Sequence, residues 1–346
     1  MKKEKVLVCI IAQARTSKFS WKSFKNNVLN HLDADLALCV SDDKEIEKNN
    51  PYYDNAKYVW KCENYKEFSP AFDWAQNEIL NGSLNLPDWK ELLIIKDYWL
   101  GGIEGSITKT SPGKRGSAAI LIFFRWFLLK CIKEKNLIEK YDRFIITRSD
   151  FIWNIPHPKM KYLDSKYIWL PNGEFYGGVT DRHAVLSKSN LESYLNIIEL
   201  IVTKPKYLIS KMLNHNKWNM EKYILLNLKL NNKKKLIKFF PYISFTVRDD
   251  QTDTTLSYGN YSKKLNLNIK YIREYIHSVI ALKFINKNHW KNIFLLNLKI
   301  RAIKFFFKFD TTRNFLLKII STSDTTLDKE LINRYYKKKK KYFKNV

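Results

Sequence analysis

Short apolar runs alternate with helix-like segments along the first half of the chain. Val6–Ala12 is almost continuously apolar and contains β-branched residues, which is typical of a strand buried on both faces, and Ala34–Val40 is a second such run. Between them, residues 21–32 place apolar side chains at helical spacing. Strand, helix and strand at this length predict a βαβ unit, and therefore an α/β fold with a mostly parallel sheet.

The middle of the chain repeats this pattern. Its most apolar stretch predicts a buried helix from Ala118 to about Lys135, with Ser117 as the N-cap. Arg125 and Lys130 interrupt the stretch, which is therefore shorter than the ~18 apolar residues that suggest a membrane span. Shorter runs predict strands at Leu92–Ile95, Arg143–Thr147, Tyr167–Leu170 and Tyr242–Val247, and helical segments at Ala184–Leu186 and after Trp218.

The composition shifts beyond residue 260. Tyr271–Phe284 and Trp290–Phe309 place aromatic and aliphatic side chains at helical spacing with Lys and Arg between them, and Lys337–Lys341 is a basic run near the end. We therefore predict an α/β domain over residues 1–260 and a basic, aromatic, helical extension over residues 261–346. The extension either lies on an anionic membrane surface or packs on the first domain with its lysines solvated, and both interpretations stay open.

The charge of the chain narrows its possible partners. Lys and Arg number 61 against 34 Asp and Glu, a formal net charge of +27. Proteins this basic usually contact phosphate groups, nucleic acid or an anionic membrane. The four cysteines are scattered without a CxxC pair, which argues against a zinc ribbon and favours reduced thiols. Residues 1–16 do not form a secretory signal, so we expect a cytoplasmic location.

Asp150 is the sharpest candidate for chemistry. It follows the predicted strand Arg143–Thr147, and ligands of open α/β sheets bind outside the carboxyl ends of the strands. A carboxylate there can hold a hard cation that bridges phosphate oxygens. An ordinary aspartate that caps the next turn is the alternative.

A second group of candidates lies between residues 177 and 183. Gly177 and Gly178 let the backbone approach a ligand closely. Asp181 could accept a proton from an attacking hydroxyl, Arg182 could pair with a carboxylate, and His183 could bind metal or phosphate. A Gly-Gly turn followed by a capping aspartate is the structural alternative.

Two segments that could contact phosphate complete the candidates. Gln13 and Arg15 follow the first strand, where doubly wound proteins place phosphate contacts, and Arg suits phosphate through paired hydrogen bonds. Arg115 precedes the helix at Ala118, and helix N-termini offer free N–H groups to phosphate; a solvated basic loop is the alternative. The chain has no GxGxxG, GxxxxGK[ST], GxSxG or HExxH motif.

The order of these motifs resembles that of bacterial and viral surface-glycan glycosyltransferases. These are GT-A-like, Rossmann-like enzymes of the kind that includes the WavE lipopolysaccharide-synthesis proteins. Ile10–Thr16 looks like their first strand with its Gln-x-Arg-Thr element, and Lys140–Phe151 resembles their Tyr-Asp…Arg-x-Asp block, the counterpart of the DxD element. Gly173–Val185 is similar to their Gly-Gly…Asp-Arg segment near the acceptor, and Asn219–Glu221 to a later Asn/Ser-x-Glu element. The resemblance covers roughly residues 5–250.

The resemblance implies an enzyme that moves a sugar from a UDP- or GDP-sugar to a glycan or lipid-linked glycan during lipopolysaccharide or capsule biosynthesis. Residues 1–260 would then be the catalytic domain, on the inner face of a membrane or free in the cytoplasm. Asp150, with His183, would hold Mn²⁺ or Mg²⁺, and Asp181 would be the general base. Arg148 occupies the first acidic position of the DxD element. The donor would be held by Gln13, Arg15, Arg115, Arg148, Gly177, Gly178 and Arg182.

Two alternatives without catalysis remain. The positive charge and the abundant Tyr, Phe and Trp would suit a nucleic-acid-binding protein through phosphate contacts and base stacking, although no helix-turn-helix, RRM or zinc-finger signature is visible. A membrane-surface scaffold would use the extension alone and would need no nucleotide site.

Overall fold

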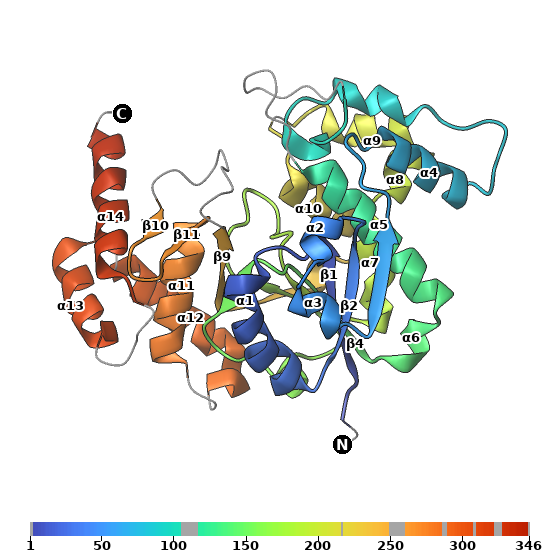
Figure 1. Ribbon diagram of the computed structural model, residues 1–346. Helices are drawn as coiled ribbons and strands as arrows, with labels where there is room; N and C mark the ends of the chain where they lie inside the picture. The colour runs from blue at the N-terminus through green and yellow to red at the C-terminus, as the bar shows by residue number, and fades with distance from the viewer. Residues whose placement is uncertain are drawn as a thin grey trace.

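A seven-stranded sheet forms the centre of the molecule (Figure 1). The computed structural model describes residues 3–104, 117–215, 217–248, 260–285, 289–306, 309–321 and 327–344. The strands lie in the order β3-β2-β1-β4-β7-β6-β8. Their bounds are β1 Val6–Ala12, β2 Asp35–Ser41, β3 Tyr58–Cys62, β4 Arg143–Thr147, β6 Ile168–Pro171, β7 Ala184–Ser187 and β8 Ile237–Phe240.

The strand directions place the end of β1 beside the end of β4. Both strands that flank β1 run parallel to it, with Ala12 paired to Val40 of β2 and Ile10 paired to Thr147 of β4. Only β7 is reversed, since it pairs antiparallel with both β4 and β6. The chain leaves β1 toward β2 on one side and later returns to β4 on the other, so the order of the strands reverses between β1 and β4. Such a switch point is where open α/β sheets bind ligands.

A smaller sheet continues from the carboxyl end of β4. It has the order β10-β11-β9-β5, and all of its pairs are antiparallel. Because β5 begins four residues after β4 ends, the small sheet sits beside the switch point. Its strands are β5 Phe151–Trp153, β9 Ser244–Arg248, β10 Tyr261–Ser262 and β11 Leu267–Ile269.

Helices cover both faces of the main sheet. The first half of the chain supplies α1 Ser17–Phe24, which continues as a π-helical turn over Lys25–Asn30, then α2 Lys44–Glu47, α3 Pro51–Asp54, α4 Ser69–Ile79, α5 Ala118–Glu134 and α6 Leu137–Lys140. The second half supplies α7 Lys188–Leu195, α8 Glu199–Thr203, α9 Pro205–Met212, α10 Met220–Leu230, α11 Ile272–Phe284, α12 Ile293–Phe306, α13 Asp310–Ser321 and α14 Lys329–Lys344.

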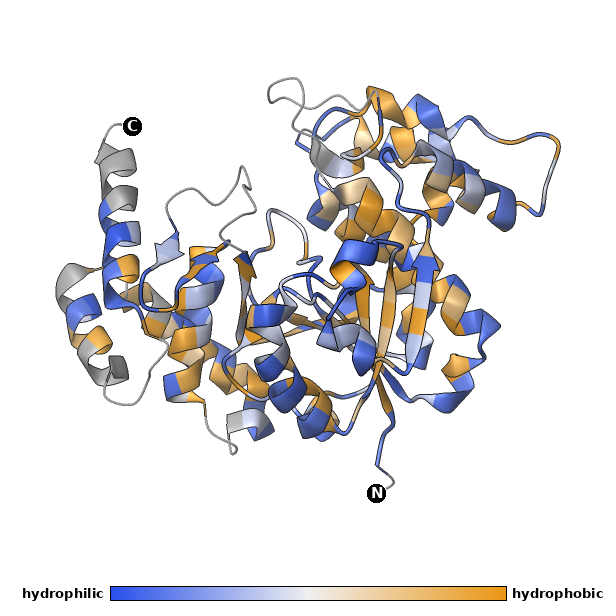
Figure 2. Cartoon of the chain, in the orientation of Figure 1, coloured by the Kyte–Doolittle hydropathy of each residue, from blue (hydrophilic) through white to orange (hydrophobic). Residues whose placement is uncertain are grey.

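The alternation of side chains along β1 explains why both faces are covered. Leu7, Cys9 and Ile11 pack in one hydrophobic core with α5, while Val8 and Ile10 pack in a second core with α1 and α11. Figure 2 shows the resulting pattern, with β1 and α5 coloured mainly as hydrophobic. A strand that is apolar on both faces needs a helix layer on each face, as its sequence indicated.

The predicted fold class is confirmed in its main features. The chain forms an α/β fold with a mostly parallel sheet flanked by helices. Two local predictions were wrong. The predicted strand Leu92–Ile95 lies at the end of a 3-10 helix, Trp89–Ile94, whose first turn is capped by the Asp88 carboxylate, and Ala184–Leu186 lies in strand β7. A short apolar run does not by itself distinguish a helix from a strand. The elements that it pairs with or packs against in the fold determine which of the two it forms.

The residues after 260 pair and pack with elements that precede them in the chain. Strand β11 pairs with β9, and α11 packs on β9 within the same core as β1. The boundary at residue 260 stays a prediction. Within the described ranges, no helix combines the length and the apolar character needed to cross a bilayer.

Candidate functional site

A pocket of about 210 Å³ opens at the carboxyl ends of β1, β2 and β4. The pocket wall includes apolar and aromatic side chains, among them Tyr65, Phe68 and Leu121. It also includes four titratable side chains, which are Arg15, Arg148, Asp150 and Lys270. A concave site lined by both apolar and cationic side chains suits a ligand that carries both a ring system and phosphate.

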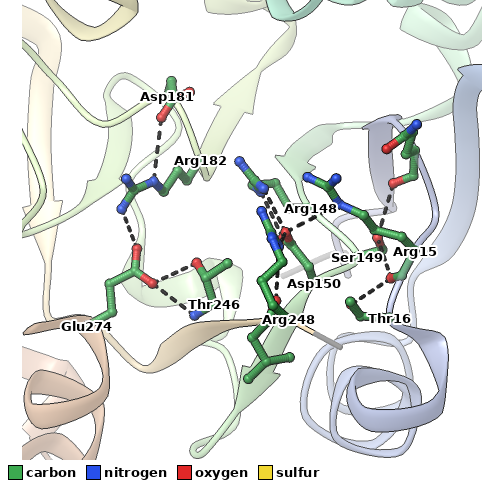
Figure 3. Close-up of polar contacts among 12 residues, drawn as sticks. Arg15, Thr16, Arg148, Ser149, Asp150, Asp181, Arg182, Thr246, Arg248 and Glu274 are labelled. Carbon is green, nitrogen blue, oxygen red and sulfur yellow. Dashed lines mark hydrogen bonds and ion pairs between the residues drawn. The ribbon is translucent and has the colours of Figure 1, made fainter. Parts of the chain in front are cut away.

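Asp150 lies among three arginine side chains, Arg15, Arg148 and Arg248, as Figure 3 shows. Its two carboxylate oxygens accept hydrogen bonds from Arg148, with Nε 2.8 Å from Oδ1 and Nη2 2.6 Å from Oδ2. Oδ2 also accepts from Nη1 of Arg248, and Nε of Arg15 lies 3.8 Å from it. Asp150 and Arg248 are each 2% exposed, whereas the side chain of Arg15 is 41% exposed and faces the pocket.

The charges of this cluster do not balance. Burial by itself would raise the pKa of the Asp150 carboxyl, but Arg148 and Arg248 hold it well below its ordinary value. Burial lowers the pKa of Arg15 to about 10, so this guanidinium is still a cation at neutral pH. Among the described residues, three guanidinium groups therefore surround a single carboxylate, and this part of the pocket has an excess of positive charge that an anion can neutralise.

Lys270 adds a fourth basic group. It comes from the segment after β11, lines the same pocket, and its Nζ lies 5.1 Å from the centre of the Tyr271 ring. Burial and the neighbouring Arg148 and Arg248 lower the pKa of Lys270 to about 6. The pocket by itself therefore favours the neutral amine of Lys270, and a bound anion would favour its protonated form.

The loop after β1 is tied to the end of β4 by Ser149. Its hydroxyl lies 3.1 Å from the carbonyl oxygen of Gln13 and 3.0 Å from that of Arg15. Ala12, which ends β1, has a φ of 73°, a conformation that non-glycine residues rarely adopt. Backbone of this kind gathers at ligand sites, because the surrounding structure must hold it in place. Gln13 and Arg15 therefore lie where the sequence predicted them, in the wall of the pocket.

Asp181 lies beyond Arg148, on the side away from Arg15 (Figure 3). Its side chain is 9% exposed, and its Oδ1 is buried with no hydrogen-bond partner among the described residues; the nearest cation is Arg182, with Nε 3.8 Å away. A buried carboxylate oxygen without a hydrogen bond is unusual and calls for a ligand, a water or a catalytic role. Burial and the nearby Asp181 also raise the pKa of Glu221 to about 8, so two carboxyl groups interact here.

Arg182 has a structural partner that the sequence did not indicate. Its Nη1 donates to Glu274 of α11, and the guanidinium lies 3.8 Å from the centre of the Tyr271 ring. Glu274 is fully buried and also accepts from the hydroxyls of Tyr242 and Thr246, at 3.1 and 2.7 Å. The prediction that Arg182 binds a cofactor therefore receives no support from its contacts, because the guanidinium anchors α11 beside Asp181.

The two glycines have a packing role. A Cβ atom on Gly178 would lie 2.0 Å from the carbonyl oxygen of Glu221, and one on Gly177, whose φ is +85°, would lie 2.8 Å from Cε of Lys222. The amide of Val179 donates to that same Glu221 carbonyl at 3.1 Å. Gly178 therefore lets the backbone approach the first turn of α10 closely. From the sequence, we had expected the backbone to approach a ligand at this position.

His183 is enclosed by protein. Its Nδ1 lies 3.0 Å from Oγ1 of Thr147 and its Nε2 lies 3.2 Å from Nε2 of His157, so both ring nitrogens are engaged. Burial lowers its pKa well below the ordinary value. His183 therefore has no free nitrogen for the metal that we predicted it to bind. Arg115 lies outside the described residues.

The donor set does not fit Mn²⁺ or Mg²⁺. Across the described ranges, no three His, Cys, Asp or Glu side chains are grouped as ligands for a metal ion. Asp150, the predicted ligand, has guanidinium donors on both oxygens, and a hard divalent cation would have to displace them against the positive charge of Arg15.

The sequence did not indicate Ser149, Lys270 and Glu274 as members of the site. Glu221 and Arg248, which follows the predicted strand Tyr242–Val247, could each complete a site from their positions, although a helix cap and a surface turn were the favoured interpretations. A sharper signal existed for Glu274, because it is an isolated acid on an otherwise apolar and basic helix, and such a charge must be paired when buried.

Comparison with known proteins adds little to this geometry. No protein-family model matches the chain, and no curated protein matches it. Among solved structures, mouse xyloside xylosyltransferase 1 in its apo form is similar, with a TM-score of 0.38 and 7% identity over 68% of this chain and 85% of that chain. A likeness at this distance says nothing about activity, so any function must be argued from the pocket and its charges.

Proposed function

We propose that the chain is a glycosyltransferase that binds a nucleoside-diphosphate sugar in the strand-end pocket and transfers the sugar to a hydroxyl group of an acceptor. The observation that carries this proposal is the excess of positive charge around Asp150, together with the unpartnered carboxylate oxygen of Asp181. The cations suit a diphosphate, and the apolar side chains of the pocket wall, Tyr65, Phe68 and Leu121, suit a nucleoside.

The protein's own cations would neutralise the diphosphate. Arg148 and Arg248 are fixed by Asp150, so their orientation costs nothing further when the ligand arrives. Arg15 is the most exposed of the three and can turn toward phosphate oxygens in paired hydrogen bonds. We therefore propose a donor site that works without Mn²⁺ or Mg²⁺, in place of the metal that the resemblance implied.

The reaction would use Asp181 as the base. The acceptor oxygen forms a bond to the anomeric carbon of the sugar, the bond from that carbon to the diphosphate oxygen breaks, and the nucleoside diphosphate leaves with the electron pair. Asp181 takes the hydroxyl proton of the acceptor through its unpartnered Oδ1. Arg15 and Arg148 stabilise the negative charge that grows on the leaving group. Arg182 holds Asp181 in place and is a positioning residue.

The identity of the acceptor is the finer part of the proposal. The sequence resemblance to surface-glycan glycosyltransferases is the support for a glycan or lipid-linked glycan acceptor, and for a UDP- or GDP-sugar as donor. Nucleic acid is the less favoured ligand of this site. The cations here surround a buried carboxylate at the ends of β-strands, whereas proteins that bind single-stranded nucleic acid present their cations along an open groove.

A binding and turnover experiment tests the proposal. Calorimetry with UDP, UMP and uridine, and with GDP, GMP and guanosine, should show that one diphosphate binds at least about tenfold more tightly than its monophosphate. Arg15→Gln should lower that affinity about tenfold or more, because a charged hydrogen bond contributes about 1.5–3 kcal/mol. Lys22→Gln, which changes an exposed cation on α1, is the matched control.

Turnover decides between binding and catalysis. A panel of UDP- and GDP-sugars should include one whose nucleoside diphosphate is released faster in the presence of a glycan acceptor. Diphosphate affinity that matches monophosphate affinity would contradict the binding site. Binding without release from any donor in the panel would contradict the transferase.

A further inference from the structure

The outer face of α12 is apolar although it is exposed. Phe294 is 72% exposed, Leu298 45% and Phe305 53%. The Phe305 ring packs against Phe306 and Phe309, with ring centres 5.7 and 5.5 Å apart, so these three rings form a cluster. We call this surface the α12 patch; it consists of Phe294, Leu295, Leu298, Phe305, Phe306 and Phe309.

The opposite face of α12 is already used by the protein. Leu296 and Ile300 are 2% and 3% exposed and pack in the core that contains β1 and α11. The amide of Asn297 donates to the carbonyl oxygen of Phe239, at the end of β8, at 2.8 Å. The helix is therefore fixed in rotation, and the α12 patch cannot turn inward. A helix on the surface of a globular protein is normally polar on its outer face.

Cations border the patch on both sides. At about 100° per residue, the patch on the helix spans roughly 120°, from Phe294 to Phe306. Arg301 lies about 20° beyond one edge and Lys299 about 20° beyond the other, and both are exposed. An apolar stripe flanked by Lys and Arg is the arrangement of helices that lie in the plane of a membrane surface.

The charge of the whole region points to an anionic partner. Residues 261–346 contain 21 Lys and Arg against five Asp and Glu. A second copy of this chain would bring the same positive charge against itself, which opposes association through this face. An anionic lipid surface complements both the charge and the apolar stripe.

The length of α12 excludes a spanning orientation. Its 14 residues extend for about 21 Å, short of the ~30 Å hydrocarbon core of a bilayer. We propose that the α12 patch docks the protein on an anionic phospholipid bilayer, with α12 parallel to the surface and its aromatic side chains at the level of the headgroups. This proposal is independent of the function proposed for the pocket, since none of its residues lines that pocket.

Vesicle flotation of the full chain tests it. We expect binding to vesicles of phosphatidylcholine mixed with phosphatidylglycerol, little binding to phosphatidylcholine alone, and weaker binding at high salt. The triple variant Phe294→Ser, Leu298→Ser, Phe305→Ser should bind the anionic vesicles about tenfold less or weaker. A triple variant at exposed apolar positions elsewhere, Leu84→Ser, Ile94→Ser, Leu213→Ser, should bind like the wild type; those side chains are 100%, 55% and 57% exposed.

If the triple variant does not fold, a single cysteine labelled with a dye tests the proposal instead. The native cysteines Cys9, Cys39, Cys62 and Cys131 are all buried, so Phe294→Cys can be labelled selectively with a polarity-sensitive dye. Its emission should rise and shift to the blue with anionic vesicles, while the same dye on Leu84→Cys should not respond. No binding of the wild type to anionic vesicles, or no response at position 294, would overturn the proposal. A concentration-dependent dimer that the triple variant abolishes would assign the patch to a second copy and would also overturn it.

Discussion

Arg148 and Asp150 form a two-point ion pair across the single residue that separates them, with Nε 2.8 Å from Oδ1 and Nη2 2.6 Å from Oδ2. The carboxylate at the end of β4 thus serves as the hydrogen-bond acceptor that positions guanidinium groups. In this arrangement Asp150 contributes to the site by orienting Arg148, which lines the pocket.

Asp150 should be essential for stability as well as for the site. Asp150→Asn removes the carboxylate that accepts hydrogen bonds from Arg148 and from the deeply buried Arg248, and breaking a buried ion pair costs about 3–5 kcal/mol. Urea denaturation should show this loss. Asp42→Asn, at a side chain that is 44% exposed, should change the free energy of unfolding by less than about 1 kcal/mol. Equal stability of the two variants would show that the pair at Asp150 is not formed.

Turnover should not depend on a divalent cation. Because guanidinium groups occupy both oxygens of Asp150, we expect donor turnover to be the same within about twofold in EDTA and in Mn²⁺ or Mg²⁺. Release of nucleoside diphosphate from the best donor of the panel, after dialysis against a chelator, is the measurement. Loss of activity on dialysis with recovery on addition of Mn²⁺ would mean that the arginines move aside for a metal.

The affinity for the donor should rise as the pH falls toward 6. Lys270 has a pKa lowered to about 6, and Arg15, Arg148, Arg248 and Asp150 are the charged groups around it. A bound diphosphate favours the protonated amine and raises the pKa of Lys270. Binding therefore takes up a proton at pH values between the pKa of the free protein and the pKa of the complex, and the affinity levels off below about pH 6. Calorimetry with a nucleotide sugar from pH 8 to pH 5 should show the rise in the wild type and a flatter profile in Lys270→Met.

Asp181→Asn should reduce the rate of transfer more than donor binding. The amide keeps the shape of the side chain and removes its basicity, and a general base contributes about 10²–10⁴-fold to rate. We expect kcat to fall at least about 100-fold with donor affinity changed less than about threefold. Glu192→Gln, at an exposed carboxylate, is the control. If Glu221→Gln abolishes transfer and Asp181→Asn does not, the base is Glu221.

Gly178 should tolerate no side chain. In Gly178→Ala the new Cβ would lie 2.0 Å from a backbone carbonyl oxygen, so α10 or the turn must move, at a cost of about 3 kcal/mol or more. Gly82→Ala is the comparison, since its Cβ would meet nothing within 4 Å and only the φ of +69° causes strain, about 1–2 kcal/mol. Thermal unfolding of both variants measures the difference. A smaller loss at Gly178 than at Gly82 would contradict the packing role.

The sequence by itself determined the elements whose environment is uniform along their length. Val6–Ala12 is apolar at every position and contains β-branched residues, which favours a strand between two layers, and α5 is apolar around most of its circumference over 17 residues, which favours a buried helix. The place of Gln13, Arg15 and Asp150 at strand ends followed from the same pattern, because parallel strands end at one edge of the sheet.

Only the tertiary structure decided what those side chains meet. Arg248 reaches Asp150 across 98 positions and Glu274 reaches Arg182 across 92, and such contacts depend on strand register and helix packing that no local pattern encodes. The same holds for Gly178, whose freedom is used by the backbone of α10, and for His183, whose nitrogens are taken by Thr147 and His157. Local periodicity determines whether an element is a strand or a helix, while the charge balance of a site depends on side chains brought together from distant segments.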